Sequence, residues 1–439
     1  MGRTKRKRTK NKLQLSNVNL GHERTVINLK KWLKANNFVD PLNLELRNFI
    51  GTGRGVTARK GIQPSDVLIR VPFGLLITFD TVRKSDLLCY LTQEIPLTIQ
   101  TFLALFLIME KHKGVKSKWK NYIDSLPYPE PTLPWMCEPE DINLYPEDLK
   151  LEALKLQEIF NDCIENVKRS LLTTEVCKCC GEPVNYLVES CSLKWAYVLV
   201  NTRAVYIDPE YLMSNDNSNA SWLADDPFLA LCPYMDLINH HYVAKTKANV
   251  VSIQGQAFYQ LTTMTAFKKY EQFFISYGAH NNDKLLMQYG FFIPGNFFDS
   301  IRISLEEILT VLNVPLTERQ YKYIKSHKYE ADDLYINENG VSFILKAILF
   351  VCFHPNILNY GAYIFSNRYP NSFDDLVTKS SKSLLRFKLE IYENDLKRPS
   401  ENGKFSNACF QTLKEYLEYR IKYIRELLRL LDENKLHFS

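Results

Sequence analysis

An acid, an amide and an imidazole lie within five residues of one another in the segment 232–241 (CPYMDLINHH). These groups belong to Asp236, Asn239 and His240, and most of their neighbours are apolar. The pattern indicates a half-buried segment, in which each polar side chain without a hydrogen-bond partner costs about 1–3 kcal/mol. The three side chains therefore form either a satisfied structural network, the usual situation of a lone histidine, or a surface that holds a polar ligand.

The sequence around these residues excludes two kinds of site. Neither His-x-x-x-His nor a glutamate at a matching offset accompanies His240, so no metal site is predicted among them. The Gly-x-Ser-x-Gly elbow of serine hydrolases is absent from the chain. An asparagine–histidine pair beside an acid suits hydrogen bonding to a heterocyclic or amino-acid-like ligand.

A glycine-rich block upstream, 51–55 (GTGRG), could bring backbone close to a ligand because glycine adopts positive φ freely. It lacks the Gly-Lys-Ser/Thr of a P-loop and the spacing of a dinucleotide-binding fingerprint, and it opens a strand rather than a helix. Taken alone, the block indicates a plain tight turn.

A third block, 274–291, contains Tyr277 and Tyr289, each followed by glycine. Asn281 and Asn282 offer an N-cap for a short helix over 283–288. A single tyrosine in such a block indicates core packing with a satisfied hydroxyl. We nevertheless expect the three blocks to meet in space.

Charge is distributed unevenly along the 439 residues. The net charge is +6, yet residues 1–12 hold seven Lys or Arg and no acid, which leaves 48 basic against 49 acidic residues in the rest. The basic tail predicts a nuclear localisation signal or a nucleic-acid-contacting arm, or else a solubilising terminus. A nearly neutral body argues against extensive or sequence-specific nucleic-acid binding. No apolar run approaches membrane length, so a soluble intracellular protein without membrane contact is expected.

Ten cysteines in so long a chain do not form a disulfide framework. One cluster, 177–181 (CKCCG), lies between Cys163 and Cys191. A Cys-x-x-Cys pair supplies half of a tetrahedral zinc site, but no second matching pair follows. Free thiols, and no metal, are the prediction.

The rest of the sequence alternates between β-rich and helical segments, which predicts an α+β fold. Helical spacing occurs at 25–38, 99–111, 149–172, 192–208 and beyond 294, where 304–307 and 317–320 read as capping boxes. Short β runs occur at 56–59 and 67–71, expected to form a hairpin or meander, and at 75–78, 249–262 and 273–276. The β core is therefore split by a helical insertion, since a structureless loop of that length is implausible.

We expect five parts along the chain. They are a basic disordered tail (1–22), a helix with the first part of the β core (23–80), a helical insertion with a cysteine-containing loop at 177–191 (81–230), the second part of the core (231–295) and an all-helical C-terminal lobe (296–439).

Together the motifs resemble the SET-domain protein methyltransferases, specifically their Rubisco-methyltransferase-like branch. The segments that carry the resemblance are 30–38 (KKWLKANNF), 51–55, 193–206 (LKWAYVLVNTRAVY), 233–240 and 277–291. The resemblance spans 25–295 and continues more loosely through the C-terminus. It implies a split β-rich SET domain with a helical insertion, followed by a helical substrate-binding lobe.

The resemblance also implies an activity, which is transfer of a methyl group from S-adenosylmethionine to a lysine ε-amine of a protein. Histone tails are the expected substrates, the nucleus and cytoplasm the expected locations, and a monomer the expected state. The residues implied to contact the cofactor are Gly53, Arg54, Gly55, Arg203, Asn239 and His240, with Asp236 in support and Tyr277 alongside. Tyr277 is implied to be the active-site tyrosine, and Tyr289 to line the lysine channel or the cofactor pocket.

Two alternatives stay open at this point. One is methylation of a histidine at the same cofactor site, because the polarity of the channel cannot be derived from one sequence. The other is a catalytically silent adaptor that keeps the SET fold for docking. The presence of Arg203, Asn239, His240 and Tyr277 together argues against the adaptor, because a scaffold has no physical need of this set.

Overall fold

The computed structural model describes residues 17–128, 133–212, 221–327, 333–398 and 407–436. Contacts divide the chain into a first unit, Met1–Pro131 with Lys155–Ala279, and a second unit, Thr132–Leu154 with His280–Ser439. The second unit thus begins earlier than 296 and includes a piece of the expected insertion, while the five expected boundaries remain predictions. Most of the predicted basic tail, 1–16, lies outside the described residues.

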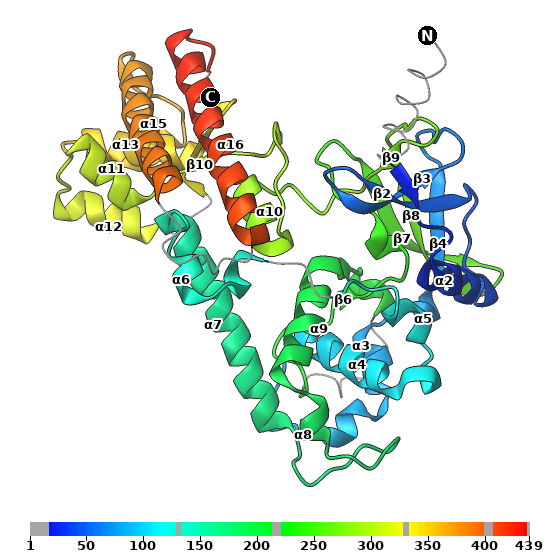
Figure 1. The fold of residues 1–439 in the computed structure, drawn as a ribbon. Coiled ribbons are helices and arrows are strands. Elements are labelled where there is room, and N and C mark those ends of the chain that lie inside the picture. The colour runs from blue at the N-terminus through cyan, green and yellow to red at the C-terminus, as the bar shows by residue number, and fades with distance from the viewer. Residues whose placement is uncertain (1–16, 129–132, 213–220, 328–332, 399–406, 437–439) are drawn as a thin grey trace, which may run out of the picture. The chain divides into compact units, whose positions relative to one another are not determined.

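The first unit holds the β-structure that frames the predicted site (Figure 1). One antiparallel sheet has the order β1-β2-β3-β9, formed by Asn17–Asn19, Leu44–Phe49, Gly53–Ala58 and Gln272–Phe273. A second has the order β4-β8-β7, formed by Val67–Pro72, Gln256–Thr263 and Thr246–Ile253. A two-stranded ladder joins β5 (Val205–Tyr206) to β6 (Leu229–Ala230).

The prediction that 56–59 and 67–71 form a hairpin or meander is wrong. β3 pairs with β2 and β9, whereas β4 pairs with β8 in the other sheet. β2 (LELRNF), which was not among the predicted strands, is the partner of β3, and its Leu44 and Leu46 are buried. The third expected run, 75–78, is also not a regular strand, because Phe73–Leu75 forms a 3-10 helix (η1) and only Ile77 pairs, with Leu231.

The hairpin expected at 249–262 is confirmed as β7 and β8. Its turn residues are Gln254 and Gly255, with φ of +50° and +77°. Two successive positive φ values match the right-handed twist of paired strands, so this turn sets the register of the hairpin.

Helices of the first unit surround the longest buried one, α4 (Ile99–Lys113), which packs against α9 (Ser190–Arg203). The predicted helices at 25–38 and 99–111 are confirmed as α2 (Arg24–Ala35) and α4. The helix predicted to begin the segment 192–208 is confirmed as α9, which ends at Arg203, as predicted, because Ala204 is already extended. The remaining helices of this unit include α3 (Phe79–Arg83), α5 (Lys120–Ile123) and α8 (Val184–Leu187), and the division between units falls inside α7 (Glu147–Ser170).

Beyond 294 the second unit is mainly helical, as predicted, but the expectation of an all-helical lobe is wrong because three short strands pair within it. Its helices are α6 (Pro139–Ile142), α10 (Asn282–Tyr289), α11 (Leu305–Leu312), α12 (Glu318–Ser326), α13 (Phe343–Phe353), α14 (Tyr360–Ile364), α15 (Phe373–Lys397) and α16 (Asn407–Asp432). A small sheet of β10 (Ile301–Arg302), β11 (Tyr335–Asn337) and β12 (Gly340–Val341) joins them. Both predicted capping boxes, at Ser304 and Thr317, are confirmed.

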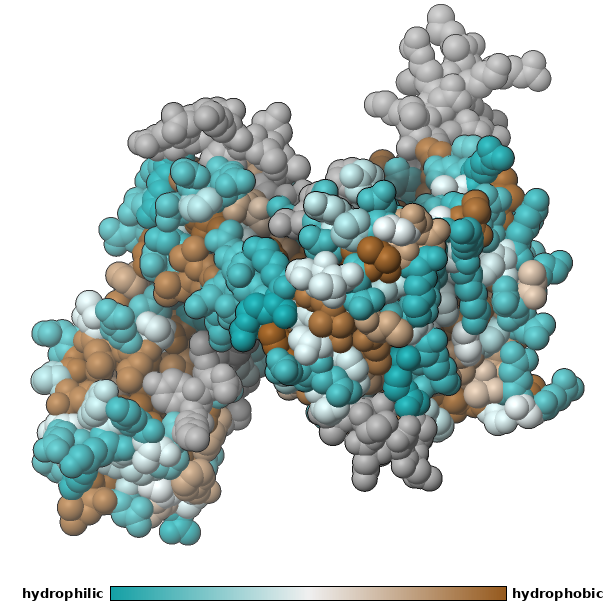
Figure 2. Space-filling model, turned by 90° about the horizontal axis from the view of Figure 1, so that it is seen from below, coloured by the Kyte–Doolittle hydropathy of each residue, from teal (hydrophilic) through white to brown (hydrophobic). Residues whose placement is uncertain are grey.

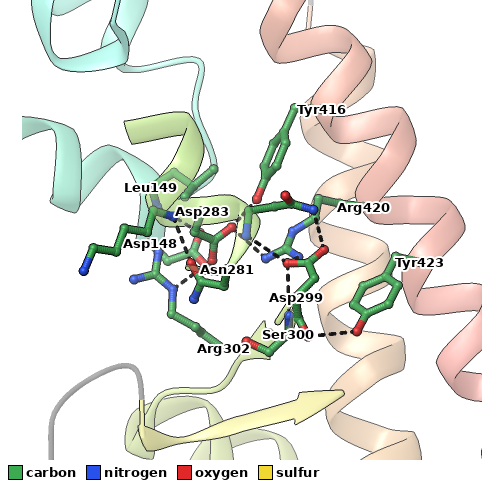
Figure 3. A network of polar contacts seen from close by, with 12 residues as sticks. Asp148, Leu149, Asn281, Asp283, Asp299, Ser300, Arg302, Tyr416, Arg420 and Tyr423 are labelled. Atoms are coloured by element: carbon green, nitrogen blue, oxygen red, sulfur yellow. Dashed lines mark hydrogen bonds and ion pairs between the residues drawn. The ribbon is translucent and has the colours of Figure 1, made fainter. Parts of the chain in front are cut away.

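α15 and α16 pack against each other, and a buried polar network lies beside α16 (Figure 3). Arg420, fully buried, donates to Asp283 at 2.7 Å and to Asp299 at 3.1 Å. Arg302 pairs with Asp283 at 2.9 Å, and the Tyr416 hydroxyl donates to the same carboxylate. The network joins the α10 end of this unit to α16.

The surface is mixed in polarity. Figure 2 shows hydrophilic residues over much of one face, with apolar residues gathered on part of the second unit. Large exposed apolar residues of this unit include Tyr321, Phe343, Leu358 and Phe365. None of the described helices is both long and apolar enough to span a bilayer.

Candidate active site

The glycine block forms the turn that enters β3. Gly51 and Gly53 have φ of +87° and +65°, and nothing lies within 4 Å of the position a Cβ would take at either. Positive φ favours glycine at both positions. At Gly51 and Gly53 the turn therefore presents bare backbone with open space beside it.

Asn239 holds this turn from the opposite segment. Its Nδ2 donates to the carbonyl oxygens of Arg54 at 3.0 Å and Thr52 at 3.3 Å. A Cβ at Gly55 would stand 3.0 Å from the same Nδ2 and would also meet the Gln272 amide. The side-chain amide of Asn239 is thus engaged within the protein, and its predicted contact with the cofactor stays a prediction.

Asp236 lies in a 3-10 turn, η7 (Met235–Leu237), which follows Tyr234 at φ +74°. Its side chain is fully buried, and Arg203 at the end of α9 donates from Nη1 to the Asp236 carbonyl at 2.7 Å. The same Nη1 lies 3.6 Å from the carboxylate Oδ2, to which the Tyr122 hydroxyl donates at 2.8 Å. Burial raises the pKa of Asp236, and the attraction of Arg203 and the Tyr122 hydrogen bond offset this only in part.

Arg54 reaches the same region through its side chain as well as its backbone. Its Nη1 donates to the Ser125 carbonyl at 2.8 Å. Burial lowers the pKa of Arg54, and the neighbouring Arg203 guanidinium lowers it further. Two cationic groups are therefore close to a buried acid, which suits a ligand that carries a carboxylate.

Sequence reasoning missed Tyr122 and Ser125, which belong to α5 and its C-terminal flank. Neither residue lies in a motif. The signal that could have found them is weak, since it consists only of a buried tyrosine whose hydroxyl must find a partner.

His240 and Tyr277 form the second part of the site. His240 and Ile275 form an isolated parallel β-bridge. The Tyr277 backbone N–H donates to His240 Nδ1 at 2.9 Å. His240 Nδ1 is therefore an acceptor and carries no proton. The two rings lie 5.1 Å apart, and the Tyr277 hydroxyl donates to the Ile238 carbonyl at 2.9 Å.

Tyr289 belongs to the second unit, where it ends α10. Its ring stacks with that of His280 at 6.1 Å, and burial raises its pKa. The predicted N-cap of this helix is confirmed, since Asn281 accepts from the Lys284 N–H. A place for Tyr289 at the lysine channel remains a prediction.

The expected meeting of the three blocks is confirmed for the residues of the first unit. Asn239 bonds to the glycine turn, and His240 bonds to Tyr277. The residues also fit S-adenosylmethionine. The turn offers open backbone, and Asp236 Oδ1 is a buried acceptor that no described side chain or backbone group satisfies.

A cavity of about 440 Å³ lies elsewhere in this unit and is lined by Lys30, Glu45 and Arg59, among others. None of the predicted site residues lines it. We place the site at the converging hydrogen bonds, because those are made by the polar groups whose chemistry suits the ligand.

The chain is similar to known proteins over most of its length. It is 33% identical to human SET domain-containing protein 4 over 350 residues. The aligned region covers 76% of this chain and 74% of the human protein. The chain is 31% identical over 362 residues to the mouse protein of the same name, covering 80% and 78%. No protein-family model matches the chain.

Among solved structures, the fold is similar to the SET domain of LSMT, a structure bound to lysine and AdoHcy. The TM-score is 0.57 with 17% identity, and the match covers 94% of this chain and 92% of that one. The likeness extends through both parts of the chain and therefore includes the expected split core and C-terminal lobe.

Proposed function

Because the chain belongs to the SET domain-containing protein 4 family, we propose that it transfers a methyl group from S-adenosylmethionine to the ε-amine of a lysine in a protein. One observation carries the proposal: the glycine turn, the Asp236–Arg203 pair and the His240–Tyr277 pair are gathered in one unit by direct hydrogen bonds. Methylation of histidine and a silent adaptor role have no comparable support.

Each residue of the site has its own part in binding S-adenosylmethionine. The backbone at Gly53, Arg54 and Gly55 faces the ligand, and Arg203 with Arg54 attracts its carboxylate. Asn239 holds the turn in shape, and His240 is fixed in one tautomer by the Tyr277 N–H. When bound, S-adenosylmethionine supplies an electrophilic methyl group on a positively charged sulfur.

The substrate amine must first lose a proton, because an ammonium has no lone pair. An aromatic, desolvating surface disfavours the charged form of lysine and lowers its pKa. Tyr277 supplies such a surface, and its hydroxyl is held by the Ile238 carbonyl, which fixes the ring. Holding the amine in line with the methyl group lowers the barrier without a covalent enzyme intermediate.

Histones are the substrate class we propose, with access to both nucleus and cytoplasm. The basic run at 1–12 supports nuclear entry, and a nearly neutral body leaves recognition to protein contacts rather than to nucleic acid. The helical second unit is the proposed substrate-binding part, and the acting protein is proposed to be a monomer.

The test is isothermal titration with S-adenosylmethionine of the wild type, Asn239→Ala and Tyr277→Phe. We expect a dissociation constant on the order of micromolar for the wild type. Binding should be lost in Asn239→Ala, because the turn loses its anchor, and largely kept in Tyr277→Phe. Asn48→Ala is the matched control, since this exposed asparagine lies opposite Arg54 in the same sheet.

Methyl transfer to purified histones is then measured with labelled cofactor, with a ribosomal protein fraction in parallel. Tyr277→Phe should bind cofactor and transfer far less methyl. Absence of cofactor binding by the folded wild type would refute the enzymatic proposal. Labelling of the ribosomal fraction alone would refute the histone assignment and leave lysine methylation standing.

A further inference from the structure

Three thiols and one imidazole gather at the C-terminal end of α4. One potential ligand atom from each of His112, Cys177, Cys179 and Cys180 lies within 4.8 Å of all the others. Within the described part of the chain, no other group of three or more His, Cys, Asp or Glu residues is so arranged. We propose that these four residues bind one zinc ion, at a site separate from the methyl-transfer site.

The cysteines lie on a tight hairpin turn. The Cys177 N–H donates to the Glu182 carbonyl at 2.8 Å, and the Gly181 N–H donates back to the Cys177 carbonyl at 2.8 Å. Gly181 has φ +81°, which explains the glycine after the last cysteine. The Cys179 N–H also approaches Cys177 Sγ at 3.5 Å, and an N–H directed at sulfur stabilises a thiolate.

His112 supplies the fourth ligand from a distant part of the sequence. It lies in the last turn of α4, and its Nε2 is 3.2 Å from Cys180 Sγ. Cys177 Sγ and Cys179 Sγ are 3.1 Å apart. The two sulfurs are too far apart for a disulfide, whose sulfurs lie about 2.0 Å apart. Zn–S of about 2.3 Å and Zn–N of about 2.0–2.1 Å place tetrahedral ligands somewhat farther apart than these two pairs of atoms lie, so a small outward movement of these side chains would admit the ion.

The donor set favours zinc over other cations. Three thiolates and an imidazole form the Cys₃His set of structural zinc sites, whereas Mg²⁺ and Ca²⁺ prefer oxygen. Four protein ligands fill the tetrahedron and leave no position for water, so the ion is structural rather than catalytic. Cys177 is 3% exposed while Cys180 is exposed, which gives the ion an inner anchor and a route of entry.

The role that follows is to fasten the loop after α7 to α4. Lys178 already pairs with Asp86 at 2.8 Å, and its backbone N–H donates to the Tyr90 hydroxyl. These contacts are polar and partly exposed, and an exposed ion pair contributes little. α4 packs against α9, the helix that ends at Arg203. A zinc ion bound at the C-terminal end of α4 therefore stabilises the packing of α4 against α9, the helix that positions Arg203.

The experiment is native mass spectrometry of the full chain, purified without chelator and then given one equivalent of zinc. We expect one zinc per chain in the wild type and in Cys137→Ser, a control at a cysteine of the second unit. Cys177→Ser/Cys180→Ser should hold none, and His112→Gln should lose its zinc to a chelator far sooner than the wild type. Absence of zinc from the folded wild type, or equal zinc in the double variant, would overturn the proposal.

Cobalt substitution keeps the test decisive if the double variant fails to fold. Wild-type protein loaded with Co²⁺ should show an intense thiolate-to-cobalt band, and the single variant Cys180→Ser, at an exposed position, should lose about a third of it. A wild type without that band, or an unchanged band in Cys180→Ser, would refute the ligand set. Neither readout depends on methyl transfer, so the two proposals fail independently.

Discussion

Asp236 in the first unit and Asp283 in the second are both fully buried, yet their surroundings differ. Asp283 is held by two guanidiniums, Arg420 at 2.7 Å and Arg302 at 2.9 Å, and by the Tyr416 hydroxyl. Burial raises the pKa of Asp283, but the two arginines outweigh burial and hold the pKa below its ordinary value. Asp236 has one arginine at 3.6 Å, and burial keeps its pKa above its ordinary value.

The difference separates a scaffold from a binding site. A buried charge is costly unless it is paired and hydrogen-bonded. The Asp283 network meets this condition among side chains of its own unit, so it needs no ligand. The Asp236 site is incompletely compensated, and its buried Oδ1 accepts no hydrogen bond from the described residues, which leaves an interaction for a ligand to complete.

The largest loss of stability should follow from disrupting the buried network around Asp283. Arg420→Met leaves Asp283 and Asp299 buried without their shared cation, and should cost about 3–5 kcal/mol of unfolding free energy. Urea-induced unfolding measures this. Arg425→Met on the same helix is the matched control, because Arg425 is 64% exposed in its pair with Glu393 and should cost no more than about 1 kcal/mol. Equal losses in both variants would contradict the contrast between buried and exposed pairs.

A smaller effect is expected at the glycine turn. Gly55→Ala places a Cβ against the Asn239 and Gln272 amides, and should cost about 1–3 kcal/mol through overpacking. The same displacement of Asn239 should weaken binding of S-adenosylmethionine in a titration. Gly74→Ala is the control, since nothing lies within 4 Å of its Cβ position. An unchanged affinity in Gly55→Ala would show that the turn does not depend on Asn239.

The smallest effect is a difference in pH dependence, and its sign distinguishes the two acids. Because the folded pKa of Asp236 is raised, its contribution to stability is lost as pH rises from the ordinary value of 3.8 through the folded pKa. Because the folded pKa of Asp283 is lowered, its contribution is present above 3.8 and is lost as pH falls through the folded pKa.

Unfolding free energies of the wild type, Asp236→Asn and Asp283→Asn are therefore compared across the acidic range. Relative to Asp236→Asn, the wild type should lose stability as pH rises. Relative to Asp283→Asn, the wild type should gain stability as pH rises. Slopes of the same sign would remove the distinction between the two acids.

Local patterns predicted the parts of the molecule that depend on neighbours in sequence. The 304–307 and 317–320 capping boxes and the Asn281 cap each involve groups a few residues apart, and all were confirmed. The motifs at 51–55, 233–240 and 277–291 likewise indicated the family and the residues gathered in the first unit.

Strand pairing could not be predicted in the same way. β3 and β4 are adjacent in sequence but lie in different sheets, where β2 and β8 are their respective partners. The roles of Tyr122 and Arg420 were also missed, since a buried hydroxyl or guanidinium acquires its partner only when distant elements pack.

The amino-acid sequence by itself determined the family, the helices and turns, and the residue types of the methyl-transfer site, because each rests on short-range spacing or on a shared motif. Only the tertiary structure decided which charges are compensated and that His112 joins the three cysteines 65 or more positions later in the chain. The physical reason is that burial and ligand geometry are properties of side chains that converge in space, and one-dimensional spacing does not specify that convergence.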